Sequence, residues 1–477
     1  MASKPDCAGW PTWVAATALS LVFWWLATGL HPLWWAAWLA PIPVLWLATR
    51  VPAPRAAAAA FLASALASFS VWSYYHNVIK LPVAVLVFAM TASAVIFTLA
   101  LLLYRRLNII GRPLAAMMAV PVLWTALGFV NAQLSPNGTW GNLSYSQMNA
   151  PILIQIAALT GLWGIGFLVL LVAAGVASMA NRNTSSSMRV CVAGLTAVVM
   201  VLALSYGGWR LHSTNLEPHD SVLVGLAAME TTGTSPQLGS VKGQELSQRY
   251  AAAIKKLASD GAQVVVLPEK VWSLNQASAP ALAQLAQRHS LTLVAGVVMH
   301  RHEHEYNMAL ALDGHANESS EYTKHHLVTG WERAFTPGSG YTTLVWLAHT
   351  GLAICKDMDF PAMGRSYAKR DVRLLLVPAW DFGTDSWLHS RMAILRGVES
   401  GFAIARTARD GTLTLSDDRG RVLAETPSNL GADAVLLGTL PLRRDRTLYA
   451  RWGNWFAWLD LAGLLVLLGL ALRPARL

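Results

Sequence analysis

The sequence predicts a polytopic α-helical membrane domain joined to a water-facing α/β sandwich. The composition is 54% hydrophobic and only 13% charged, whereas soluble domains typically hold about 25% charged residues. Long stretches contain no Asp, Glu, Lys or Arg, while residues 217–446 have an ordinary charge density. This polar part alternates short apolar runs with helical patterns, which is typical of a sheet covered by helices.

Eight apolar stretches approach the length of about 20 residues that a helix needs to cross a bilayer. Seven precede the polar part and one follows it, and the first is too long for a signal peptide and lacks a small-residue cleavage site. The chain therefore divides into a transmembrane domain (1–210), a polar domain (218–448) and a C-terminal transmembrane helix (454–472). The expected spans are Trp10–Leu30, Leu33–Thr49, Ala56–Tyr75, Leu81–Tyr104, Leu114–Leu134, Ile152–Ala180, Val190–Trp209 and Asn454–Leu472.

The arginines that flank these spans predict the orientation of the chain. They fall on alternate loops, whereas the opposite loops hold Lys80 and almost no other basic residue. The positive-inside rule puts the arginine side in the cytoplasm. After seven crossings the polar domain would then lie on the periplasmic side of a bacterial inner membrane. The net charge of +10 comes from these flanks, so we expect no nucleic-acid partner. The arginines are Arg50, Arg55, Arg105, Arg106, Arg112, Arg182, Arg189, Arg473 and Arg476.

The polar domain begins with two apolar runs that read as buried strands, Ser221–Ala228 and Gln263–Leu267, with a helical pattern at Gly243–Ser259 between them. A second helix is expected at Met392–Ser400. Long apolar strands are typical of sheets that are covered on both faces. Further strands are predicted at Leu291–Val298, Met308–Leu312, Thr343–Ala348, Gly351–Cys355, Val372–Val377, Phe402–Thr407 and Thr412–Ser416.

Three residues at the ends of predicted strands are candidates for chemistry: Glu269, Lys324 and Cys355. Functional groups of α/β folds collect at strand ends. Taken singly, each has an ordinary explanation, as a helix-capping acid, a solvated lysine or a buried structural cysteine. Cys355 is the single cysteine of the polar domain, so no disulfide framework accounts for it. Together, at three successive strand ends and in this chain order, the three residues are a far more specific signal than any one of them.

These residues lie in motifs that resemble a known family. The motifs are Leu267-Pro268-Glu269, Tyr322-Thr323-Lys324-His325-His326-Leu327-Val328 with Glu332 eight residues after Lys324, and Cys355-Lys356-Asp357-Met358-Asp359-Phe360-Pro361. The polar domain resembles the nitrilase superfamily of carbon–nitrogen hydrolases. The layout of seven spans, polar domain and final span resembles the apolipoprotein N-acyltransferase family. Asn307 and the stretches His389–Glu399 and Trp124–Gly166 match as well. The resemblance implies a nitrilase-like αββα sandwich with a Glu-Lys-Cys triad.

The resemblance also implies a reaction in two steps. Cys355 would attack an ester of a membrane phospholipid and form a thioester, and the N-terminal amine of a lipoprotein would then take the acyl chain. Glu269 would act as the general base, and Lys324 would favour the thiolate and the tetrahedral oxyanion. Glu332 would position Lys324 or the amine. No cofactor and no metal are implied.

The sequence departs from the family pattern at two places. Lys356 and Asp357 stand where the family has an aromatic residue and a glutamate, and Lys356 could lower the thiol pKa or attract an anionic group. Glu332 runs directly into residues 333–338, where family members hold an extra apolar arm. Two alternatives therefore stay open: a membrane-anchored amidase or an acyltransferase with another amine or amide substrate, and a non-enzymatic scaffold. Labelled lipid on Cys355 would separate the first alternative from acyl transfer out of phospholipid. The scaffold is disfavoured because all three catalytic positions are intact, and a Cys355→Ala variant with full activity would revive it.

Alternating histidines at His300, His302 and His304 superficially suggest a metal site. Acidic residues intervene, however, and no cysteine is near. We therefore expect a polar hairpin here rather than a metal centre.

Overall fold

The computed structural model describes residues 8–181, 184–213, 221–230, 235–275, 280–316, 318–429 and 431–474. Two compact units are formed. The helical unit comprises Met1–Ser135, Trp140–Leu211 and Asn454–Leu477, and the sandwich unit comprises Pro136–Thr139 and His212–Gly453. Arg182, Arg476 and the expected start of the polar domain at residue 218 lie outside the described residues.

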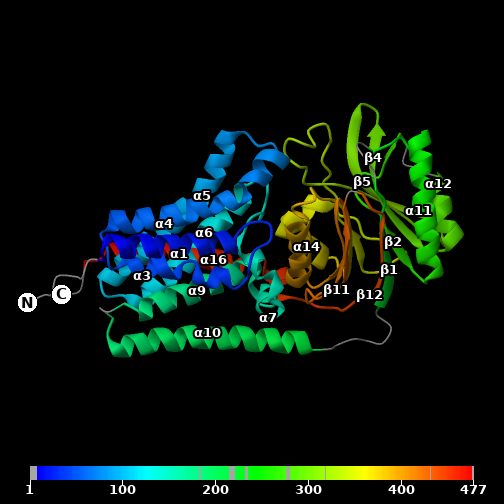
Figure 1. Cartoon of the computed structure of the whole chain (residues 1–477). Coiled ribbons are helices and arrows are strands. Elements are labelled where there is room, and N and C mark those ends of the chain that lie inside the picture. The colour runs from blue at the N-terminus through cyan, green and yellow to red at the C-terminus, as the bar shows by residue number, and fades with distance from the viewer. Residues whose placement is uncertain are drawn as a thin grey trace, which may run out of the picture. The chain divides into compact units, whose positions relative to one another are not determined.

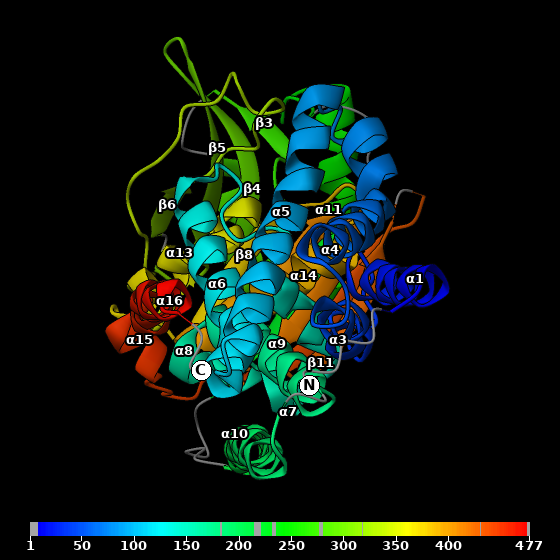
Figure 2. The same cartoon turned by 90° about the vertical axis from the view of Figure 1, so that its left-hand side faces the viewer.

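Seven helices in the described part of the chain are long and apolar enough to cross a membrane. Figure 2 looks along most of them and shows α10 at the edge of the helical unit. Shorter apolar helices are α2 (Ala36–Leu39), α3 (Ile42–Ala48), α7 (Pro151–Ile154) and α8 (Ala157–Thr160). The long helices are α1 (Trp10–Ala27), α4 (Ala53–Ala67, extended by a 3₁₀ turn to Val71), α5 (Val83–Ile109), α6 (Pro113–Leu134), α9 (Leu162–Met179), α10 (Ser186–His212) and α16 (Trp455–Leu472).

The predicted span Leu33–Thr49 is not one long helix but the pair α2 and α3, and the span predicted at Ile152–Ala180 is likewise divided into α7, α8 and α9. Pro41 and Pro43 lie where α2 ends and α3 begins, and proline has no backbone N–H to continue a helix. The backbone N–H of Ala8 nevertheless donates to the carbonyl of Arg50 at 3.0 Å. The chain therefore returns, after α3, to the end of the unit at which α1 begins.

Arginines join the ends of four helices at one end of the helical unit. The Arg50 guanidinium donates to the carbonyl of Ala180 after α9 at 2.6 Å. Arg105 donates to the carbonyl of Ala48 in α3, and Arg106 donates to that of Ala471 in α16 at 2.9 Å. Such bonds satisfy carbonyls that a helix end leaves unpaired. Arginines that are spread over alternate loops in the sequence thus gather on one side of this unit.

The sandwich unit contains two sheets. The seven-stranded sheet has the order β12-β1-β2-β4-β5-β6, with β3 paired to β4, and the five-stranded sheet has the order β11-β10-β9-β8-β7. The strands of the first are β1 (Ser221–Ala228), β2 (Val264–Val266), β3 (Trp272–Leu274), β4 (Thr292–Arg301), β5 (His304–Leu312), β6 (Ser319–Thr323) and β12 (Ala434–Pro441). Those of the second are β7 (Thr350–Leu352), β8 (Leu374–Trp380), β9 (Ala403–Arg409), β10 (Gly411–Ser416) and β11 (Val422–Ser428).

Alternating side chains build the layers of this unit. Val264 and Val266 belong to a core shared with Leu374 and Leu376 of the other sheet, whereas Val265 packs with residues of α11 (Val241–Ser259) and α12 (Pro280–His289). On the other side, α14 (Ser386–Ser400) packs on β9 and β10, close to α13 (Pro361–Ala368). Figure 1 shows the sheets between α11 and α12 on one side and α14 on the other. The predicted αββα class is confirmed.

Some predicted elements differ from the structure. Thr343–Ala348 is not a strand, because only Thr343 pairs, in an isolated bridge with Gly351. α14 begins at Ser386 rather than Met392. The alternating histidines lie at the β4–β5 hairpin, where the His300 ring contacts the Ser273 hydroxyl at 2.6 Å. The described residues contain no group of three or more His, Cys, Asp or Glu side chains placed to hold a metal ion.

Candidate active site

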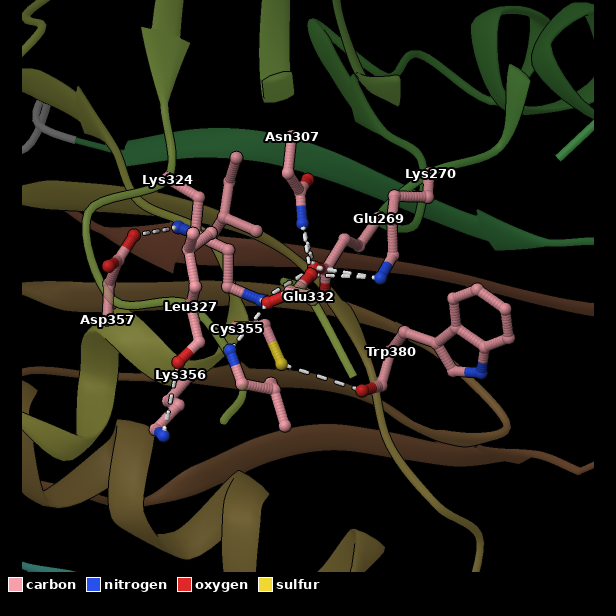
Figure 3. A network of polar contacts seen from close by, with 12 residues as sticks. Glu269, Lys270, Asn307, Lys324, Leu327, Glu332, Cys355, Lys356, Asp357 and Trp380 are labelled. Atoms are coloured by element: carbon pink, nitrogen blue, oxygen red, sulfur yellow. Dashed lines mark hydrogen bonds and ion pairs between the residues drawn. The ribbon is translucent and has the colours of Figure 1, made fainter. Parts of the chain in front are cut away.

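The predicted site residues converge at one place in the sandwich unit. Glu269 follows β2, Lys324 follows β6, and Cys355 opens the 3₁₀ turn η4 (Cys355–Asp359) after β7. All three side chains are buried. Figure 3 shows Glu269, Lys324 and Glu332 grouped beside Cys355. The structure therefore brings together the four residues that the motifs single out.

Cys355 sits on a strained turn. Its φ of +45° lies in the left-handed region, which costs an L-residue about 1–2 kcal/mol. The turn is held by Asp357, whose backbone N–H donates to the Ile354 carbonyl at 3.0 Å and whose carboxylate accepts from the Ile354 N–H at 3.1 Å. The sulfur lies 3.5 Å from the Trp380 carbonyl. The turn thus fixes the direction of the thiol.

The Asp357 carboxylate also joins the nucleophile turn to the segment that carries Lys324. It accepts hydrogen bonds from the Tyr322 hydroxyl at 2.7 Å and from the His326 backbone N–H at 2.9 Å. His325 donates its backbone N–H to the same carboxylate at 3.2 Å. Asp357 is therefore occupied by structural contacts on both sides of the site.

Lys324 lies between two carboxylates. Its ammonium is 2.8 Å from Glu269 Oε1 and 2.9 Å from Glu332 Oε2, and all three side chains are 1% exposed. Burial lowers the pKa of Lys324, but the charges of Glu269 and Glu332 outweigh it and hold that pKa well above its usual value. Lys324 is thus a fixed cation beside the sulfur.

Two further residues complete the network. The Asn307 amide in β5 donates to Glu269 Oε1 and, at 2.8 Å, to Glu332 Oε1. Lys270 donates to Glu332 Oε1 at 2.9 Å. Burial raises the pKa of Glu332, but Lys324 and Lys270 overcome this and hold the pKa well below its usual range. The family resemblance includes Asn307 but assigns it no role, and it does not single out Lys270.

The Cys355 thiol is neutral at rest. Burial raises its pKa, the nearby charge of Glu269 raises it further, and Lys324 opposes both only in part. The net pKa is well above that of a free thiol. Because the thiolate is the nucleophile, a base must take the proton as the sulfur attacks. Such an arrangement suits nucleophilic catalysis assisted by a general base.

The Lys356 ammonium binds groups other than the thiol. Its ammonium donates to the Asn137 side chain at 2.9 Å and to the Leu327 carbonyl at 3.3 Å, and Figure 3 shows it directed away from the sulfur. Next to Asn137, Thr139 donates its backbone N–H at 3.0 Å and its hydroxyl at 2.7 Å to the carbonyl of Asp359. Residues 136–139, which interrupt the helical unit in the sequence, therefore hold both ends of the nucleophile turn.

The segment after Glu332 turns directly back to the sheet. Phe335 donates its backbone N–H to the Glu332 carbonyl at 3.2 Å, and Thr336 donates to that of Glu305 at 2.8 Å. Gly338 then donates to the Lys324 carbonyl at 2.9 Å. These backbone hydrogen bonds hold the short segment against β5 and next to Lys324.

Comparison with known proteins gives two family matches. Residues 20–175 match the model of the apolipoprotein N-acyltransferase N-terminal domain. Residues 234–444 match the carbon–nitrogen hydrolase model. The two matches fall on the helical unit and the sandwich unit respectively, with residues 136–139 inside the first match.

Curated relatives share most of the chain. The apolipoprotein N-acyltransferase of Geobacter metallireducens is 27% identical over 76% of this chain and 75% of its own length. That of Gloeobacter violaceus is 28% identical over 73% and 70%. Among solved structures, an amidase from Nesterenkonia aligns with a TM-score of 0.42 and 22% identity, covering 52% of this chain and 99% of its own. A carbon–nitrogen hydrolase from Helicobacter pylori aligns with a TM-score of 0.41 and 17% identity, covering 50% and 94%.

Proposed function

This chain belongs to the apolipoprotein N-acyltransferase family, and on that premise we propose that it moves an acyl chain from a phospholipid, through a thioester on Cys355, to the N-terminal amine of a lipoprotein. The observation that carries the proposal is the Lys324 ammonium fixed between Glu269 and Glu332 beside a buried thiol. This arrangement supplies a nucleophile, a base and a cation in one place.

In the first step Glu269 takes the proton of Cys355 as the sulfur attacks the ester carbonyl of the phospholipid. A carbon–sulfur bond forms, and the oxygen of the tetrahedral intermediate carries a negative charge that Lys324 stabilises. The ester carbon–oxygen bond then breaks, and the proton held by Glu269 passes to the leaving oxygen. The products are the thioester and a lysophospholipid.

In the second step the amine of the acceptor attacks the thioester carbonyl. Glu269 accepts a proton from the attacking nitrogen, a carbon–nitrogen bond forms, and the carbon–sulfur bond breaks. The proton returns to the thiolate, which restores the starting site. The raised pKa of the thiol favours that return. Both half-reactions use the same base and the same cation.

The location we propose is the bacterial inner membrane, with the sandwich unit on the periplasmic side. The multi-pass character of the chain follows from its long apolar helices. The arginine contacts at the ends of α3, α5, α9 and α16 support a single positively charged side of the helical unit, which the positive-inside rule assigns to the cytoplasm. In the sequence, α10 is the last helix of the helical unit before the sandwich unit.

The test uses the purified full-length protein in liposomes of phosphatidylethanolamine with labelled acyl chains. We expect label on the protein that is removed by hydroxylamine, which cleaves thioesters, and that passes to a diacylglyceryl-cysteine peptide when this is added. Cys355→Ala should remove the label. Cys191→Ala, at an exposed cysteine of α10, should keep it.

Two results would contradict the proposal. Absence of label on the wild-type protein would mean that phospholipid is not the donor. Label that is released only as free fatty acid, with none on the lipopeptide, would identify a hydrolase instead.

A further inference from the structure

Lys270 is a second cation at the paired carboxylates. Its ammonium lies 2.9 Å from Glu332 Oε1 and 3.9 Å from Glu269 Oε1, and its side chain is only 16% exposed. The reaction described above gives it no part. A charge at this distance nevertheless acts on both carboxylates of the site.

The backbone turns Lys270 toward the site. In an extended chain, neighbouring side chains point to opposite faces, so Lys270 would point away from the carboxylate of Glu269. Its φ of +53° instead places it in the left-handed region, which is unfavourable for lysine. The turn is held by the Glu269 backbone N–H, which donates to Ala379 at 3.1 Å, and by the Val271 N–H, which donates to Gly296 at 2.8 Å. The fold therefore imposes this direction on the side chain.

Two aromatic rings hold the ammonium on the site side. It lies 5.0 Å from the ring centroid of Trp380 and 5.6 Å from that of Phe335, within the range of cation–π attraction. The Cys355 thiol donates to the backbone carbonyl of the same Trp380 at 3.5 Å. Trp380 thus contacts both Lys270 and the nucleophile.

The charges around the site require a second cation. Glu269 and Glu332 share the amide of Asn307, and two carboxylates this close repel each other, so that one of them tends to keep a proton. Lys324 alone would leave one uncompensated negative charge. With Lys270, two cations balance the two carboxylates. Lys324 can then stabilise the additional negative charge that forms during attack.

We propose that Lys270 is a positioning residue that keeps Glu332 ionised and in place, so that Lys324 can stabilise the oxyanion formed at Cys355. This inference rests on the proposed acyl transfer. The charged or titratable groups that face Glu332 are Glu269, Lys270, Lys324, Cys355 and Lys356. Of these, Lys270 and Lys356 have no part in the reaction, and Lys270 is the one that forms an ion pair with Glu332, at 2.9 Å.

The test is the pH dependence of thioester formation in labelled phosphatidylethanolamine liposomes, compared for wild type, Lys270→Met and Lys270→Arg. Loss of the cation should raise the pKa of Glu332, so the acidic limb for Lys270→Met should move upward by about one pH unit or more. On that limb its rate should then be about tenfold or more below that of the wild type at the same pH. Lys270→Arg should keep the wild-type limb. Lys255→Met, on the exposed face of α11, is the matched control.

A second readout needs no acyl transfer. The ion pair contributes stability while Glu332 is ionised, and this contribution is lost as the pH falls through the lowered pKa of Glu332. The difference in Tm between wild type and Lys270→Met should therefore be larger near about pH 7 than near about pH 2.

An unchanged acidic limb in folded Lys270→Met, or a Tm difference that does not vary with pH, overturns the inference. A uniform loss of rate at every pH would indicate only a packing role and would also contradict it. If the wild-type protein forms no thioester, acyl transfer itself fails, and the Tm comparison still decides whether Lys270 keeps Glu332 ionised.

Discussion

Lys324 and Glu269 form a buried ion pair beside a neutral thiol, and the two residues respond differently to substitution. Glu269→Gln keeps the shape of the side chain, whereas Lys324→Ala leaves two buried carboxylates with one cation fewer. Removing one partner of a buried pair typically costs about 3–5 kcal/mol. The two substitutions should differ less in how far they reduce acyl transfer than in how far they reduce stability.

We predict that Glu269→Gln, Lys324→Ala and Cys355→Ser each reduce acyl transfer by about a hundredfold or more, since each removes the base, the cation or the nucleophile. Lys324→Ala should also lower Tm by several degrees, and by more than Glu269→Gln, which keeps the shape of the side chain, although both proteins should still fold. Transfer of labelled acyl chains and thermal unfolding measure the two effects. Near-normal transfer in any of the three variants would remove that residue from the mechanism.

The charge of Glu269 also predicts the reactivity of the thiol. Because this carboxylate raises the pKa of Cys355 and Lys324 lowers it, Glu269→Gln should shift the pH midpoint of Cys355 alkylation downward. Lys324→Met should shift it upward. Alkylation by a neutral reagent, followed by mass spectrometry against pH, measures the midpoint. A downward shift in both variants would exclude the charge arrangement described here.

At the residue scale, the sequence was sufficient to predict the motif residues of the site, but it was not sufficient to predict that Lys270 belongs to the site. Strand ends and family motifs point to Glu269, Lys324, Glu332 and Cys355, and the structure brings them together. Lys270 follows Glu269 directly, and an alternating pattern directs it to the opposite face. Only its positive φ brings it back to Glu332, and a lysine carries no sequence signal for that conformation.

The loop of residues 136–139 lies within the first family match and contacts the nucleophile turn. Gly138 has a φ of +53°, and a Cβ added there would lie 2.6 Å from the carbonyl oxygen of Asp359. That carbonyl accepts two hydrogen bonds from Thr139. A side chain at Gly138 must therefore displace the turn that carries Cys355.

We predict that Gly138→Ala slows thioester formation by about tenfold or more, because small misplacements of a nucleophile are costly. Gly141→Ala is the matched control, since Gly141 also has a positive φ, of +75°, but a Cβ there meets nothing within 4 Å. The rate of acylation from labelled phospholipid measures both. Equal rates in the two variants would mean that the loop does not position the nucleophile.

Elements with a strong local signal could be predicted, and those set by the surrounding fold could not. The apolar strands β1, β2 and β9 and the helix α11 follow from their patterns. Leu33–Thr49 is apolar throughout, and its prolines divide it into α2 and α3. Thr343–Ala348 has the composition of a strand but pairs at a single residue, because strand formation depends on an available neighbour.

For the whole molecule, the arrangement of arginines predicts on which side of the membrane the C-terminus and the residues after α10 lie. The ends of α3, α5, α9 and α16 meet through Arg50, Arg105 and Arg106. If that side is cytoplasmic, a reporter fused after Leu477 should be cytoplasmic and one inserted after Ser213 should be periplasmic. Alkaline phosphatase and green fluorescent protein fusions distinguish the two compartments. Active phosphatase at the C-terminus would contradict the topology.

The most direct measurement of the central claim is the mass of the proteolytic peptide that contains Cys355, taken after the full-length protein has been exposed to phosphatidylethanolamine of one defined acyl chain. We predict that this peptide gains the mass of that acyl group and loses it when the lipopeptide is added. An unmodified Cys355 peptide under conditions in which the lipopeptide becomes acylated would show that the acyl chain travels by another route.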